Sequence, residues 1–190
     1  MVLGMFTLGL FFVHRLLDMG LHFFVRSDAR VDAQRSVLRL TGKLSREFHS
    51  SLGTALMLGY QTTPAAGDLV LSFPHPQAGD GSLVPDPGTG SVCYPTQLIY
   101  YRNAADNSVR RYAVPVSPPT SLPSPLKLAS LLASLQPGQS LATEVVSLQA
   151  LDLEKQTPTD QPQNPLHLLV LLRTTKGESI KLQVFLRAAR

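Results

Sequence analysis

The sequence predicts an α+β fold, in which one long N-terminal helix packs on a small antiparallel β-sheet domain. The helix is predicted because no proline occurs before Pro64 and because apolar residues recur every three or four positions in the second part of this stretch. The sheet is predicted because short apolar runs, separated by turn residues, fill the rest of the chain. The run from Ile180 to Leu186 alternates apolar and polar residues, which is typical of a half-buried strand.

The first segment, residues 1–25, is dominated by Phe, Leu, Val and Met. Only thirteen residues precede His14, whereas a helix that spans a bilayer needs about 20 apolar residues. We therefore interpret the segment as the back half of a membrane or assembly helix. Arg15 and Asp18 are three positions apart, so they can pair on the helix and lower the cost of immersing their charges. The residues expected to form the membrane and assembly surface are Phe6, Leu8, Leu10, Phe11, Phe12, Val13, Leu16 and Leu17.

The second segment, residues 26–52, is charged and amphipathic, and we expect it to continue the helix into the globular domain. Its apolar stripe is predicted to face the sheet. The residues of this helix-to-sheet face are Ala33, Val37, Leu40, Leu44 and Phe48. Residues 26–50 contain six Lys or Arg against three Asp or Glu, interleaved along the helix. Stacking aromatics and a nucleic-acid-binding motif are both missing, so these charges indicate a solvated face and no nucleic-acid partner.

The third segment, residues 53–190, is predicted to be an antiparallel β domain. Two Pro/Gly-rich loops, 74–95 and 115–125, interrupt it. The expected strands are Thr54–Tyr60, Asp68–Phe73, Gln97–Arg102, Val109–Val116, Leu141–Glu154, Leu166–Arg173 and Ile180–Arg187. A short helix is expected at Leu126–Leu135. Gly177 lies in the turn of the last hairpin, where it can adopt a positive φ.

The residues carry no recognisable catalytic or metal-binding pattern. Nucleophile-elbow, zinc-protease, phosphate-loop and calcium-loop motifs are all absent from the sequence. The single cysteine, Cys93, excludes an intrachain disulfide and a cysteine-based metal site. The five histidines are scattered, and only His14 and His22 have helical spacing. We therefore expect no enzyme activity, no cofactor and no metal.

The order of several local motifs resembles a known family. These motifs are Arg15-Leu-Leu-Asp18, Asp32-Ala-Gln-Arg35, Leu44-Ser-Arg-Glu-Phe48, Val145-Val-Ser-Leu148, Leu166–Leu172 and Ile180–Arg187. Together they resemble the type IV pilin-like family, in particular minor pilins of type IV pili and minor pseudopilins (J- or W-type) of type II secretion systems. The first three are similar to the region where the family's helix leaves the membrane and docks on its sheet. The last three are similar to the family's closing strands.

The resemblance implies a structural, non-catalytic subunit. It would assemble through its N-terminal helix with other pilin or pseudopilin subunits into a hetero-oligomeric filament. It would reside in the bacterial inner membrane, with its globular domain on the periplasmic side.

One hallmark of that family is missing from the N-terminal segment. The family has a basic leader, a Gly cleavage point and a Glu at the fifth position of the apolar helix. Here the stretch Gly4-Met5-Phe6-Thr7-Leu8 is the nearest candidate, and Gly9 occupies the fifth position. Two interpretations follow: an atypical subunit that lacks the Glu, or a sequence whose leader lies upstream of Met1. We favour the second, and expect the reading frame to continue upstream with an apolar stretch that contains one Glu, preceded by a basic leader that ends in Gly.

A second function class is compatible with the sequence. The chain can be a membrane-tethered extracytoplasmic binding module that uses the loops 74–95 and 115–125 as its ligand or partner surface. Loops of this length in a compact domain are often functional.

Overall fold

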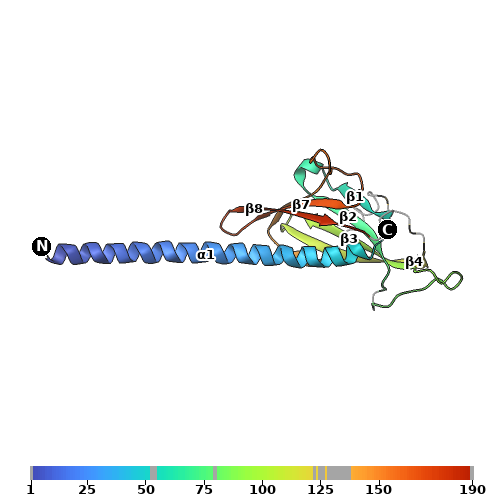
Figure 1. The fold of residues 1–190 in the computed structure, drawn as a ribbon, viewed down its shortest axis with the longest axis horizontal. Coiled ribbons are helices and arrows are strands. Elements are labelled where there is room, and N and C mark those ends of the chain that lie inside the picture. The colour runs from blue at the N-terminus through green and yellow to red at the C-terminus, as the bar shows by residue number, and fades with distance from the viewer. Residues whose placement is uncertain are drawn as a thin grey trace.

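The computed structural model describes residues 2–51, 55–78, 81–121, 123, 127 and 138–188, with only the backbone for residues 2–8. One long helix packs on two antiparallel sheets, which is an α+β arrangement (Figure 1). Helix α1 spans Val2–His49 without interruption, three residues shorter than the end expected at Leu52. Arg46 and His49 lie in its last turn, where cations interact favourably with the helix dipole.

The two halves of α1 have different surroundings. The N-terminal half extends away from the sheets, as Figure 1 shows, and every residue from Leu10 to Asp28 except Gly20 is exposed. Among the helix residues whose side chains are described, Ala33 is the first that is buried. At 1.5 Å per residue, the helix from Val2 to Asp28 is about 40 Å long. The molecule is therefore a small domain with a long projecting rod.

The larger sheet contains five strands in the order β1-β2-β3-β4-β5, and all neighbours are antiparallel. The strands are β1 Met57–Tyr60, β2 Leu69–His75, β3 Tyr94–Asn103, β4 Ser108–Thr120 and β5 Gln139–Ala142, with a 3-10 turn at Pro64–Ala66 between β1 and β2. The hairpin predicted around residues 103–108 is present as β3–β4, and its turn contains Asn107 at φ 51°.

The smaller sheet contains three antiparallel strands in the order β6-β7-β8. They are β6 Val145–Leu151, β7 Leu166–Arg173 and β8 Ser179–Leu186. The turn between β7 and β8 contains Gly177 at φ 81°, which confirms the positive φ predicted there. The tip of this hairpin reaches back along α1 (Figure 1), where Arg30 Nε lies 3.9 Å from a Glu178 carboxylate oxygen.

The two sheets meet at Gly67. The Leu148 amide of β6 donates a hydrogen bond to the Gly67 carbonyl at 2.7 Å, and Asp68 forms a parallel bridge with Leu148. Gly67 has φ +65°, and a Cβ at this position would lie 1.9 Å from Ser147 Oγ and 2.9 Å from Ser147 Cα. Both the backbone conformation and the close approach of the two sheets therefore require glycine.

The predicted helix-to-sheet face forms part of the main core. Ala33, Val37, Leu40, Leu44 and Phe48 are each no more than 3% exposed. Phe48 packs edge-on against a neighbouring ring, Phe73, at a centroid distance of 5.3 Å. The core joins these helix residues to apolar residues from both sheets.

Several predicted boundaries in the β domain are wrong. Both ends of the loop expected at 74–95 are strand, because β2 continues to His75 and β3 begins at Tyr94. The connector expected at 115–125 begins inside β4, which continues to Thr120. Proline is tolerated there because β5 pairs only with residues 109–111, so the far half of β4 is an edge that needs no donor from Pro115. The single strand expected at Leu141–Glu154 is divided between β5 and β6, because Glu144 adopts φ +63° between them. The helix expected at Leu126–Leu135 lies, apart from Lys127, outside the described residues.

Candidate functional site

The projecting half of α1 exposes large apolar side chains to solvent. Of the residues predicted for the assembly surface, the six that are described are all more than half exposed. They are Leu10, Phe11, Phe12, Val13, Leu16 and Leu17. The side chains of Phe6 and Leu8 lie outside the described part of the structure. Met19, Leu21, Phe23 and Phe24 extend this apolar surface toward the domain, with 65% exposure or more. An exposed apolar surface of this extent is typical of an interaction site.

One line of this surface continues along the docked half of the helix. Its members follow each other at intervals of seven residues. They are Leu10, Leu17, Phe24, Val31 and Leu38, and we call them the heptad line. Leu38 is 69% exposed, although its neighbour Val37 is 3% exposed and faces the core. The heptad line therefore lies on a side of α1 that the domain leaves uncovered. A seven-residue apolar repeat is the pattern by which helices pack side by side.

The polar residues of the projecting half gather on another side of the helix. His14, Asp18 and His22 follow each other at intervals of four. His22 Nε2 lies 3.6 Å from an Asp18 carboxylate oxygen. The Arg15–Asp18 pair considered from the sequence is not the one the structure forms, because Arg15 instead lies over the Phe11 ring at 5.6 Å. In the pair that forms, the acidic residue precedes the basic one by four positions, which is the more favourable orientation on a helix.

Within the part of the chain that the structure describes, no helix combines the length and the apolar character required to span a membrane.

A second cluster lies where the end of α1 meets the larger sheet. Tyr100 Oη donates a hydrogen bond to Glu47 Oε2, and Arg111 Nε donates to the same oxygen at 2.9 Å. Tyr100 and Arg111 are cross-strand partners in β3 and β4, so the register of this hairpin places both beside the helix. The side chains of Glu47 and Arg111 are only 13% and 21% exposed.

Burial and charge shift the pKa values of this cluster. Burial raises the pKa of the Tyr100 phenol, and the hydrogen bond to Glu47 raises it further. Burial alone would lower the pKa of Arg111, but the contact with Glu47 outweighs it and the pKa is raised. The cluster is therefore a neutral phenol and a charged guanidinium held on one carboxylate.

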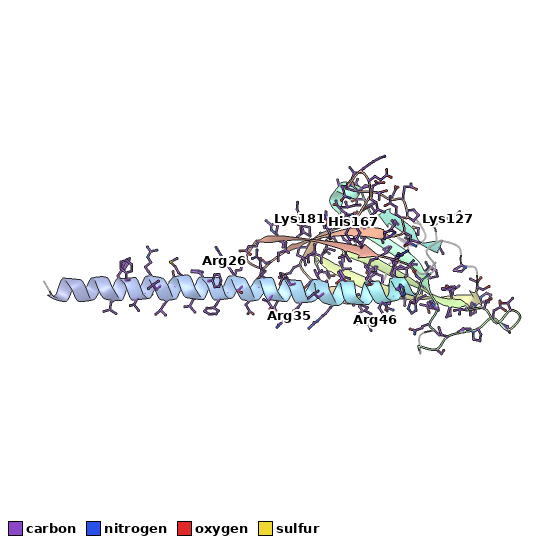
Figure 2. All side chains as sticks on the ribbon, viewed as in Figure 1. Arg26, Arg35, Arg46, Lys127, His167 and Lys181 are labelled. Carbon is purple, nitrogen blue, oxygen red and sulfur yellow. The ribbon has the colours of Figure 1, made fainter. Side chains whose placement is uncertain are left out.

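Two members of this cluster, Glu47 and Arg111, line a cavity of about 810 Å³. Three residues of α1, Lys43, Arg46 and Glu47, line the cavity together with Ser50, which directly follows the helix. Their spacing is i, i+3, i+4 and i+7. Figure 2 shows Arg46 close to the C-terminal end of α1. The sheet contributes His75, Thr96, Leu98, Arg111 and Ala113, and the loop after β2 contributes Pro76, Gln77, Ala78, Gly81 and Leu83.

Sequence reasoning predicted only one part of this cavity as a possible ligand surface, the loop 74–95. It placed none of the cavity residues of the helix, β3 or β4 in a site. It treated the charged residues of the helix as a solvated face and the histidines as scattered. The polar stripe formed by Lys43, Arg46, Glu47 and Ser50 was visible as a helical repeat beside the apolar one. Among the described residues, no three His, Cys, Asp or Glu side chains gather as metal ligands would.

Comparison of the chain with protein-family models, with curated proteins and with solved structures finds no match.

Proposed function

We propose that this chain is a structural, non-catalytic minor pilin or pseudopilin subunit that assembles through α1 into a pilus-like or secretion-system filament. The observation that carries the proposal is the heptad line, which runs from the projecting half onto the docked half of one unbroken helix. A helix that only anchored a domain would have no reason to keep Val31 and Leu38 apolar and exposed beside the domain.

The energetics favour several neighbours over one. Burying a Leu, Val or Phe side chain contributes about 2 kcal/mol, so the five residues of the heptad line would contribute about 10 kcal/mol. Association of two molecules costs roughly 4–15 kcal/mol in lost freedom. One partner helix on this line is therefore marginal. The other apolar residues of the projecting half, such as Phe12 and Phe23, would be covered by further helices or by lipid.

In this proposal the chain resides in the bacterial inner membrane, with its β domain on the periplasmic side. Its partners are other subunits that carry the same kind of apolar helix. The resemblance of the ordered motifs, from Arg15-Leu-Leu-Asp18 to Ile180–Arg187, supports this placement.

Cross-linking in the producing cells tests the proposal. A photo-reactive residue would replace Leu17 in one variant and Leu38 in another, both on the heptad line. In a control it would replace Asp32, which is exposed but lies one position after Val31 and therefore about 100° away around the helix. We expect Leu17 and Leu38 to cross-link to proteins with an apolar N-terminal helix, and Asp32 to cross-link much less. Cross-links to lipid at Leu17 together with none at Leu38 would contradict the proposal.

That contradicting outcome would favour the second candidate, a membrane-tethered extracytoplasmic binding module. One observation supports it: the cavity at the end of α1 is lined in part by the 74–95 loop, through Pro76, Gln77 and Leu83 among others. Such a module would use the helix as an anchor only, and a charge on the heptad line would leave its function intact.

A further inference from the structure

We propose that the cavity at the C-terminal end of α1 binds the carboxylate group of an apolar organic acid. This activity is independent of filament assembly, because the residues that would carry it lie at the end of α1 opposite to the projecting half. A volume of about 810 Å³ suits a small ligand, since such sites commonly measure roughly 300–1,000 Å³.

The charge of the lining favours an anion. Lys43, Arg46 and Arg111 bring three cations to the cavity, against the single carboxylate of Glu47. Glu47 is already engaged, because it accepts hydrogen bonds from both Tyr100 and Arg111. Within the described part of the chain, neither Lys43 nor Arg46 forms an ion pair, although Lys43 Nζ donates to Gln139 Oε1 at 3.1 Å. Two cations therefore remain for a ligand.

His75 adds a polar group from the opposite wall. It lies at the end of β2 and is 8% exposed. Its Nδ1 accepts a hydrogen bond from the Gln77 amide at 3.3 Å, so the neutral ring carries its proton on Nε2. Burial lowers the pKa of His75, which keeps the ring neutral at pH 7 even though Glu47 lies near enough to oppose the shift. His75, which lines the cavity from the sheet, is thus a neutral polar group.

The apolar residues that line the cavity favour a ligand whose carboxylate is attached to an apolar chain. Leu98 and Ala113 lie on the face of the sheet that looks toward α1, next to Arg111 in the β3–β4 register. Leu83, at 60% exposure, provides further apolar surface from the loop. A hydrated phosphate would leave these groups without contacts, whereas the chain of an organic acid would cover them. Arginine also binds carboxylates through two parallel hydrogen bonds.

This chemistry has two sources, a free organic acid and the C-terminal carboxylate of a peptide. Calorimetric titration of the full chain in nonionic detergent tests both. The first pair of probes is hexanoate and its uncharged amide. The second is a short apolar peptide with a free C-terminus and the same peptide amidated. Empty micelles provide the blank for partitioning. We expect the acid of at least one pair to bind and its amide not to bind, and the pair that responds identifies the source.

Two variants on the same helix test the site. Arg46→Gln removes a cavity cation, and Arg39→Gln removes another exposed cation that does not line the cavity. We expect Arg46→Gln to weaken carboxylate binding about tenfold, as loss of a hydrogen bond to a charged group does. We expect Arg39→Gln to leave it unchanged. Both positions are exposed, so both variants should melt like the parent chain.

Either of two outcomes would overturn the proposal. One is equal binding of acid and amide, or no binding of either, by the parent chain in both pairs of probes. The other is an equal loss of affinity in Arg46→Gln and Arg39→Gln. That result would show that binding depends on the net charge of the protein and not on the cavity. Arg46→Lys keeps the charge without the planar fork, and it should bind with an affinity between those of the parent and Arg46→Gln.

Discussion

Glu47 is the residue on which the polar contact between helix and sheet depends. Its carboxylate accepts from a phenol on β3 and a guanidinium on β4, and all three groups are largely withdrawn from water. A buried hydrogen bond contributes about 1 kcal/mol when both partners are present, but an orphaned charge costs more. The two sides of the contact should therefore respond unequally to substitution.

We expect Tyr100→Phe to lower the free energy of unfolding by about 1 kcal/mol, because the Glu47–Arg111 ion pair survives. We expect Glu47→Gln to lower it by about 2–3 kcal/mol, because Arg111 then keeps its charge without a carboxylate partner. Denaturant melts of the two variants measure both values. A smaller loss for Glu47→Gln than for Tyr100→Phe would show that the ion pair contributes little.

The raised pKa of Tyr100 predicts a dependence on alkaline pH. Below its ordinary pKa of 10.0 the phenol is neutral in the folded and the unfolded chain. Above that pH the unfolded chain loses the proton and the folded chain keeps it, so the free energy of unfolding should fall as pH rises. Tyr100→Phe should decline less steeply, with a residual slope from Tyr60, whose pKa burial also raises. Parallel slopes for parent and variant would exclude this linkage.

Gly67 and Gly177 form a matched pair of glycines at positive φ. A Cβ at Gly177 would meet nothing within 4 Å, whereas one at Gly67 would collide with Ser147, including its backbone. We expect Gly177→Ala to cost about 1 kcal/mol from backbone strain alone. Gly67→Ala should cost at least about 3 kcal/mol, because the two sheets must also separate. Thermal melts of the two variants measure these losses of stability. Similar losses in both variants would mean that the two sheets can move apart at Gly67 at little cost.

At the scale of the element, α1 is defined by two stripes with different partners. The apolar stripe through Leu44 enters the core, and residues such as Arg39 face solvent. We expect Leu44→Asp to destabilise the domain by at least about 3 kcal/mol, because it buries an unpaired charge among apolar side chains. Arg39→Ala should change the free energy of unfolding by no more than about 0.5 kcal/mol. Equal shifts in denaturant melts would contradict this assignment of the helix face.

How far the sequence predicts each element depends on how local its causes are. The burial of Leu44 and Phe48 follows from a helical repeat within one segment, and the β7–β8 hairpin follows from alternation on both sides of Gly177. The division of β5 from β6 rests on a positive φ at Glu144, a residue type with no strong preference for that conformation. Local sequence patterns therefore predicted the strand residues but not the turn at Glu144 that separates β5 from β6.

The cluster at the end of α1 shows the same limit for a site. Tyr100 and Arg111 lie 53 and 64 positions from Glu47, and they come together only through the register of β3 and β4 and the rotation of the helix about its axis. His75 reaches the same cavity from β2. The periodicity of a single segment cannot predict that these residues from the helix and three strands come together. The heptad line, by contrast, is contained within α1 and could have been found by testing a period of seven.

At the scale of the whole molecule, the projecting apolar half of α1 should control solubility. We expect the full chain to partition with membranes or to aggregate, because its exposed Phe and Leu side chains form one continuous surface. A shortened chain of residues 26–190 should be soluble and monomeric, since it retains the buried face from Ala33 to Phe48. Fractionation and size-exclusion chromatography measure both. A monodisperse full chain without detergent would argue against the filament proposal.

The absence of any break in α1 has a mechanical consequence. Because α1 is continuous, its backbone hydrogen bonds transmit a rotation applied at Leu10 as far as Phe48. The β domain therefore rotates together with the projecting half of the helix. Neighbouring helices that contact the heptad line would therefore fix the orientation of the β domain, and of the cavity beside Arg46, about the helix axis. One additional residue in the exposed part of α1 would advance the domain by about 1.5 Å and swing it by about 100°. The number of residues in the exposed part of α1 thus determines the direction in which the β domain faces.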